Sequence, residues 1–149
     1  MLDQSKGKLL AIAVKSRDDG NMHLLDKANI TKSSGVENDP RGKRLSRQVT
    51  VVSSESWAAV CADLGKEIPW TFRRANLLVD GISLPNSKGK KLIVGNVEME
   101  VTFETTPCHV MDEAENGLKD ALVADWRGGV LCRVVKEGDI KCGDTVKLV

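Results

Sequence analysis

Cys108 is the residue whose surroundings in the sequence most suggest chemistry. It follows Pro107 at the end of an alternating segment and precedes a predicted helix. Because proline has no backbone donor, the strand should stop there and the thiol should project from a loop. A helix N-terminus can lower the pKa of a nearby thiol, and a thiolate is both a nucleophile and a soft metal ligand. The alternative is a packed loop cysteine without chemistry, and the local pattern leaves both interpretations open.

Two basic segments could bind an anion. Residues 41–47 carry four cations in seven positions, and Arg73, Arg74 and Asn76 lie just before a predicted buried strand. Arginine matches the geometry of phosphate with two parallel hydrogen bonds. Each segment also has an ordinary interpretation. Taken alone, residues 41–47 read better as a solvated loop, and the two arginines as surface ion-pair partners of the acidic stretch 112–125.

Composition excludes several classes of protein. The 149 residues hold 22 Lys and Arg against 21 Asp and Glu, a net charge of +1, with three Trp, two Phe and no Tyr. We therefore expect no nucleic-acid partner, because both a broad basic surface and a base-stacking platform are missing. The apolar run 9–14 is too short for a bilayer span or a signal sequence, so we expect a cytoplasmic protein without membrane association. The four cysteines form no CxxC pair and predict no closed zinc site.

The apolar pattern predicts a mainly β fold. About seven short strands are expected, at 8–15, 48–52, 77–79, 91–94, 97–105, 129–135 and 146–149, and one more short segment at 22–25 has some strand character. In the strand 97–105, Val97, Met99, Val101 and Phe103 should share the buried face. Most of residues 16–47 is expected to be loop. Short strands at regular spacing favour a closed or nearly closed β-barrel, and the lack of a βαβ rhythm argues against a Rossmann-type sheet.

Two short helices should be appended to this barrel. The first is expected to be capped by Ser54 and to end before Gly65, with Trp57, Val60, Cys61 and Leu64 on one face. The second should follow Asp112 and Glu115 as a capping pair and carry Leu118, Ala121 and Leu122. The length fits one domain over residues 1–149.

The segments singled out above occur in an order that resembles one family. The chain resembles a MOSC domain, the C-terminal domain of molybdenum-cofactor sulfurases, here as a stand-alone protein. The matching segments are 35–43 (GVENDPRGK), 47–53 (RQVTVVS), 73–81 (RRANLLVDG), the Pro107-Cys108 turn and 128–144. Each motif is weak alone, but the order and spacing of the set are fairly specific. One departure is Asn38, which stands where the family often has glycine.

The resemblance implies a MOSC-type β-barrel with a few short appended helices and a role for Cys108 as a sulfur carrier or a thiolate ligand to molybdenum. It implies molybdenum cofactor (molybdopterin), with basic residues near the cysteine receiving the pterin phosphate. The candidates for that role are Arg41, Lys43, Arg47, Arg73, Arg74 and Asn76. No pyridoxal-phosphate lysine motif is recognisable, so we do not expect that cofactor. Sulfur would have to come from a partner resembling a cysteine desulfurase.

Three hypotheses about function follow. In the first, the protein carries sulfur as a persulfide or binds molybdenum cofactor through Cys108. In the second, it is a molybdenum-dependent reductase of N-hydroxylated compounds that works with a redox partner protein. In the third, it is a non-catalytic binding module in which Cys108 is only packed. Whether the protein is an enzyme is left open by the sequence.

Overall fold

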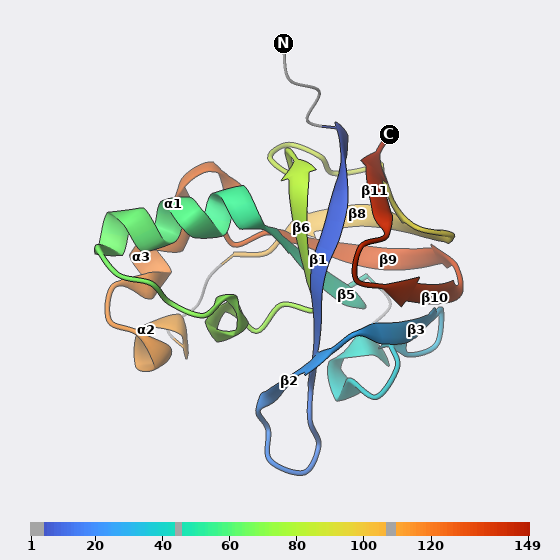
Figure 1. The fold of residues 1–149 in the computed structure, drawn as a ribbon, viewed down its shortest axis with the longest axis horizontal. Coiled ribbons are helices and arrows are strands. Elements are labelled where there is room, and N and C mark those ends of the chain that lie inside the picture. The colour runs from blue at the N-terminus through green and yellow to red at the C-terminus, as the bar shows by residue number, and fades with distance from the viewer. Residues whose placement is uncertain (1–4, 44–45, 107–109) are drawn as a thin grey trace.

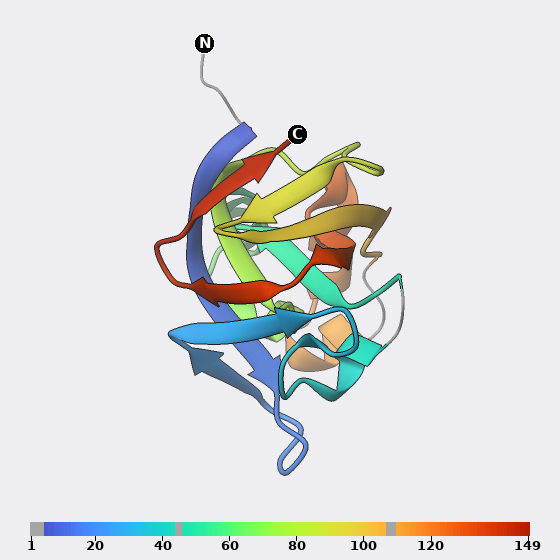
Figure 2. The same cartoon turned by 90° about the vertical axis from the view of Figure 1, so that its right-hand side faces the viewer.

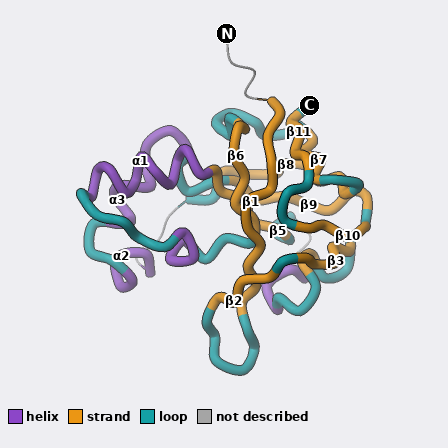
Figure 3. The backbone as a smooth tube through the Cα atoms, in the orientation of Figure 1, coloured by secondary structure: helices purple, strands orange, loops and turns teal. Residues whose placement is uncertain are grey.

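Strands dominate the fold. The computed structural model describes residues 5–43, 46–106 and 110–149. The strands are β1 (Ser5–Lys15), β2 (Met22–Leu25), β3 (Lys27–Thr31), β4 (Gly35–Val36), β5 (Val49–Ser53), β6 (Leu77–Ile82), β7 (Lys91–Val94), β8 (Val97–Glu104), β9 (Val130–Lys136), β10 (Gly138–Lys141) and β11 (Thr145–Leu148). The helices are α1 (Ser54–Leu64), α2 (Val110–Ala114) and α3 (Leu118–Val123), with 3-10 turns η1 (Pro40–Lys43), η2 (Trp70–Arg73) and η3 (Ala124–Trp126). The predominance of strands confirms the prediction of a mainly β fold. The three α-helices lie to one side of the strands (Figures 1 and 3).

Seven strands close into a barrel. The order is β11-β7-β8-β9-β5-β6-β1, and β1 then pairs with β11 to complete the ring. One edge of β1 serves two partners, because Lys6–Lys8 pair with β11 and Ile12–Lys15 pair with β2. Figure 2 shows β1 and β11, from opposite ends of the chain, side by side in the wall. Closure removes the exposed strand edges that an open sheet would present.

One crossover interrupts the antiparallel pattern. β5 and β6 pair in parallel, with Val51 opposite Leu77, and α1 and η2 lie in the connection between them. A parallel pair needs such a long connection, because a tight turn can only join antiparallel strands. This single βαβ unit is a feature that the sequence analysis did not identify, but it does not repeat among the described residues. The other strand pairings among the described residues are antiparallel, so a Rossmann-type sheet stays excluded.

A small second sheet replaces part of the expected loop at 16–47. β3 pairs with β10 and with β4 in the order β10-β3-β4. In β3, Ala28 and Ile30 alternate with polar residues, but the segment has only five residues and only Ile30 is fully buried. This short alternation is too weak a signal to predict a strand. Its partner β10 lies more than 100 residues away along the chain, in a segment for which the sequence predicts no strand. Long-range pairing, and not local propensity, fixes both strands.

The first helix is confirmed, with a shift of one residue at its start. Ser53, not Ser54, is the N-cap, and its hydroxyl accepts a hydrogen bond from the Ser56 amide. Gly65 ends the helix in the left-handed conformation, as predicted. The buried face of α1 packs with residues from η2, α2 and α3 in a second apolar cluster outside the barrel. That cluster is built on Trp57, Val60, Ile68, Met111, Leu118 and Leu122.

The second predicted helix is two helices. Gly117 has a φ of 86°, a left-handed conformation that interrupts the helix between α2 and α3. Asp112 is not the cap of a continuous helix, but its carboxylate accepts a hydrogen bond from the Lys119 amide in the first turn of α3. Within the described ranges, no helix is long and apolar enough to cross a membrane.

Phe103 lies on the opposite face from the one predicted. The register between β8 and β9 shifts between Val101 and Phe103, which marks a β-bulge. An extra residue in one strand reverses the alternation beyond it, so Val97, Met99 and Val101 are buried while Phe103 is 47% exposed. The Lys88 ammonium lies 4.9 Å from the centroid of its ring.

Candidate functional site

The two basic segments meet at one cavity. A pocket of about 530 Å³ is lined by Arg41 and Arg47 from the first segment and by Arg73, Arg74 and Asn76 from the second. We call this cavity the basic pocket; its other described lining residues are Lys15, Pro40, Gln48, Thr50, Thr105, Met111 and Leu131. These described lining residues include five cations and no carboxylate, so the pocket favours an anion. Its volume is in the range of small-ligand sites.

Lys43 does not reach the basic pocket. It is exposed and lines a neighbouring cavity of about 520 Å³ together with Asp39 and His23. Lys43 and Arg41 are two positions apart in η1, and a 3-10 helix has three residues per turn. Residues with that spacing leave the helix in different directions, which is why the structure separates these two cations.

Asp39 joins the two basic segments, because it accepts hydrogen bonds from both Arg41 and Asn76. Its side chain is 2% exposed. One carboxylate oxygen accepts hydrogen bonds from the Arg41 amide at 2.9 Å and from Arg41 Nε at 3.0 Å. The other accepts from Arg41 Nη2 at 2.8 Å, the Lys15 amide at 2.9 Å and Asn76 Nδ2 at 3.0 Å. Burial alone would raise the pKa of Asp39, but these hydrogen bonds lower it to about 2, so the carboxylate is ionised at neutral pH.

Asp39 is absent from the residues predicted from the sequence. The signal that could have found it is the run Asn38-Asp39-Pro40, typical of a turn in which an Asp side chain bonds the backbone two residues on. The bond from the Arg41 amide to Asp39 has that geometry. Asn38 has a φ of 74°, a conformation open to glycine and tolerated by asparagine. The departure from the family's glycine thus keeps a left-handed turn.

Each guanidinium nitrogen of Arg41 donates a hydrogen bond to the protein. Nε and Nη2 bind Asp39, and Nη1 donates to the Arg74 carbonyl at 2.8 Å. This last bond ties the first basic segment to the second. Arg41 is therefore part of the wall of the basic pocket, held by an ionised partner.

Arg73 is buried, 7% exposed, and its contacts are not those of a surface ion pair. Nε donates to the Gly128 carbonyl at 2.8 Å and Nη2 to the Thr105 carbonyl at 3.5 Å, while Nη1 lies 3.9 Å from Met111 Sδ. A Cβ at Gly128 would come within 2.5 Å of the Thr105 carbonyl, so only glycine fits there. Arg73 thus holds together three segments around the pocket.

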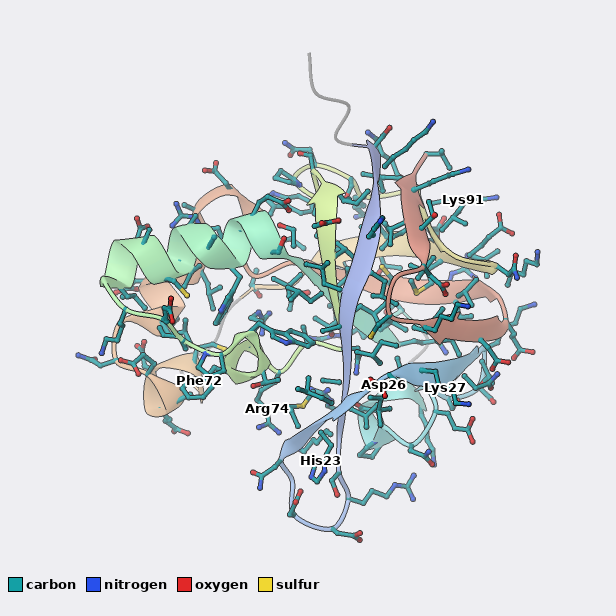
Figure 4. All side chains as sticks on the ribbon, viewed as in Figure 1. His23, Asp26, Lys27, Phe72, Arg74 and Lys91 are labelled. Atoms are coloured by element: carbon teal, nitrogen blue, oxygen red, sulfur yellow. The ribbon has the colours of Figure 1, made fainter. Side chains whose placement is uncertain are left out.

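Arg74 and Asn76 are held in different ways. Arg74 has a φ of 64° and donates from Nη2 to the Gly20 carbonyl at 2.9 Å; it makes no ion pair with any described residue. Figure 4 shows it between Phe72 and the β1–β2 hairpin, where it also lines a cavity of about 440 Å³. Asn76 is buried and bonds the Ala13 carbonyl and Asp39, while its oxygen accepts from the Thr50 amide. Asn76 therefore fixes strands more than it offers donors.

Cys108, the predicted functional cysteine, and the preceding Pro107 lie outside the described residues. Thr105 and Met111, on either side of this segment in sequence, both line the basic pocket.

The other three cysteines do not line the basic pocket. Cys61 is half-buried beside the helical cluster, Cys142 is exposed, and Cys132 is wholly buried in the barrel, where burial raises its pKa to about 12. Within the ranges the structure describes, no group of three or more His, Cys, Asp or Glu could hold a metal ion. None of these three cysteines is therefore placed to act at the basic pocket.

The family model described as the MOSC domain matches residues 20–147. The chain belongs to the MOSC domain family. This confirms the resemblance predicted from the sequence motifs, and the family is associated with molybdenum-cofactor-related functions. No curated protein is significantly similar to this MOSC protein in sequence.

Solved structures show the same fold. The YuaD protein from Bacillus subtilis matches with a TM-score of 0.83 at 19% identity, covering 96% of this chain and 95% of that one. YiiM from Geobacillus stearothermophilus matches with a TM-score of 0.76 at 17% identity, covering 96% of this chain and 75% of that one. YiiM from Escherichia coli matches with a TM-score of 0.71 at 16% identity, covering 95% and 69%. At these identities the likeness establishes the fold alone.

Proposed function

We propose that this MOSC protein binds molybdenum cofactor, with the Cys108 thiolate as a ligand to molybdenum and the basic pocket as the site of the pterin phosphate. The observation that carries the proposal is the convergence of the two basic segments on one pocket that Thr105 and Met111 also line. A thiolate is a soft ligand suited to such a metal centre, and arginine and lysine suit phosphate.

The chemistry of the pocket fits the phosphate end of such a cofactor. Five cations line it, and the Thr105 hydroxyl is buried there without a hydrogen-bond partner among the described residues. An unpaired buried hydroxyl costs free energy, so it favours a bound group that can accept or donate a hydrogen bond. When bound, the cofactor supplies a molybdenum centre able to exchange electrons with a substrate.

The protein's own residues would hold and orient that group. Asp39 keeps the Arg41 guanidinium fixed, and Arg73 binds the backbone carbonyls of Thr105 and Gly128. Because these contacts already fix the walls of the pocket, less chain freedom is lost when an anion enters. The pocket thereby favours one position for the anion.

Cofactor binding uses more of the observed site than sulfur carriage does. A persulfide carrier needs only Cys108 and a sulfur donor resembling a cysteine desulfurase, and it gives the basic pocket no role. A reductase of N-hydroxylated compounds would build on cofactor binding and would add a redox partner protein.

The test is to express the protein in cells that make the cofactor and to measure bound molybdenum and pterin. We expect both in the wild type and loss of molybdenum in Cys108→Ser. Cys142→Ser, which removes an exposed cysteine outside the pocket, is the matched control and should retain both. Mass spectrometry of Cys108 reports a persulfide directly. A persulfide without molybdenum or pterin would replace cofactor binding by sulfur carriage, and the absence of all three would refute both.

A further inference from the structure

The cations of the basic pocket are not equivalent. Arg41 donates hydrogen bonds from Nε and Nη2 to Asp39 and from Nη1 to the Arg74 carbonyl. Arg73 donates to two carbonyls and contacts a sulfur. Arg74 spends Nη2 on the Gly20 carbonyl. A donor already bonded to the protein has to break that bond before it can bind a ligand well.

Lys15 and Arg47 are different. Both line the pocket, and neither side chain forms a hydrogen bond or ion pair with a described residue. Lys15 is half-buried, and its backbone amide is bound to Asp39, so the base of its side chain is fixed. Arg47 is exposed and lies just before β5 in the sequence. These two cations carry charge that the described protein leaves uncompensated.

Thr105 supplies a third unused group. It is 9% exposed, and its Oγ1 is buried without a hydrogen-bond partner among the described residues. Its backbone is fixed, because its amide donates to the Gly129 carbonyl and its carbonyl accepts from Arg73. A hydroxyl in this position can donate one hydrogen bond to an oxyanion without moving the chain.

We infer that Lys15, Arg47 and Thr105 form the ligand-contacting part of the basic pocket and bind a tetrahedral oxyanion of the phosphate-monoester type, whereas Arg41 and Arg73 only position the walls. The inference rests on the proposed function for its biological ligand, but it concerns this chain's own residues. Two cations balance the charge of a phosphate monoester near neutral pH, and the hydroxyl adds a directional donor. Lys15 and Thr105 come from segments that the motif analysis did not single out.

The test titrates inorganic phosphate into the full-length protein produced without cofactor, at constant ionic strength, and follows binding by NMR chemical shifts. Lys15→Met and Arg47→Gln should each raise the Kd about tenfold, as expected for losing a hydrogen bond to a charged group. Thr105→Val should raise the Kd several-fold and also raise the melting temperature, because it removes an unpaired buried hydroxyl. That second readout shows that the variant is folded.

The matched control is Lys147→Met, which removes an exposed cation of β11 outside the pocket and should leave the Kd unchanged. Equal weakening in Lys147→Met and Lys15→Met would mean general charge attraction and overturn the subsite. So would the absence of phosphate binding, or a Kd unchanged by Lys15→Met and Arg47→Gln. An unchanged Kd in Thr105→Val would remove Thr105 from the subsite.

The two proposals can fail separately. Phosphate binding with no retained molybdenum or pterin would refute the proposed function and leave the subsite standing. Retained cofactor with no effect of Lys15→Met or Arg47→Gln on phosphate would refute the subsite alone.

Discussion

Replacing Asp39 with asparagine should destabilise the protein in a pH-dependent way. The substitution keeps the shape of the side chain but removes its charge and places an NH₂ group among the donors from Arg41, Lys15 and Asn76. A donor facing other donors cannot satisfy them, and the partly buried Arg41 loses its counter-charge. The wall between the basic pocket and the Lys43 cavity should therefore loosen.

The magnitude follows from the pKa of Asp39, which falls from 3.8 to about 2. A shift of nearly two pKa units corresponds to about 2 kcal/mol of stability at neutral pH. Breaking a buried ion pair costs ~3–5 kcal/mol, but Arg41 is one-third exposed and water screens part of that loss. We expect Asp39→Asn to lower the free energy of unfolding by about 2–4 kcal/mol at pH 7.

The sign of the pH effect is fixed by the lowered pKa. The charge of Asp39 stabilises the folded state fully above the unfolded pKa near 4, and that contribution is lost as the pH falls toward 2. At pH 3 about half of it should remain, so the difference between wild type and variant should shrink by about 1 kcal/mol between pH 7 and pH 3.

Urea unfolding followed by tryptophan fluorescence at pH 7, 5 and 3 measures both quantities. Asp120→Asn, which removes an exposed carboxylate with no hydrogen-bond or ion-pair partner among the described residues, is the control and should change stability little at any of these pH values. A loss below 1 kcal/mol in Asp39→Asn at pH 7 would refute the reasoning. A difference that does not change between pH 7 and pH 3 would show that the charge of Asp39 is not its source.

Three further predictions test the fold. Trp57→Ala should lose about 3–5 kcal/mol in urea unfolding, because the ring is buried and its Nε1 donates to the Ile68 carbonyl; a loss below 1 kcal/mol would contradict this packing. Gly129→Ala should lower the free energy of unfolding by about 2–4 kcal/mol, because φ is 91° and a Cβ would lie 2.1 Å from the Val51 carbonyl oxygen. Gly89→Ala is the control: its φ is 87°, but a Cβ there would meet open space, so the loss should be clearly smaller. Burial raises the pKa of Cys132 to about 12, so this thiol should resist a thiol reagent at pH 8 until the protein unfolds. Cys142 is exposed and should react in the native state. Rapid labelling of Cys132 in the native protein would contradict its burial.

Elements with strong local signals could be predicted from the sequence. β7 has the predicted bounds, and α1 ends at a left-handed Gly65. β3 and β10 could not be predicted, because their pairing joins segments that are distant in the sequence. In addition, each strand has only one fully buried residue, so its apolar pattern is weak. The bulge that turns Phe103 outward was equally hidden, because it depends on the register with β9. Local propensity does not contain that register.

By itself, the sequence determined which basic residues are present and to which family the chain belongs. The family can be identified in this way because the order of the motifs can be read along the chain before any contact is known. Only the tertiary structure decided what each residue does. It placed Lys43 outside the basic pocket, bonded Arg41 and Arg73 to the protein and gave the Lys15 and Arg47 side chains no partner among the described residues. The physical reason is the range of the interactions. The bond from Arg41 to the Arg74 carbonyl spans 33 residues and that from Arg73 to the Gly128 carbonyl spans 55, so they form only once the barrel has closed.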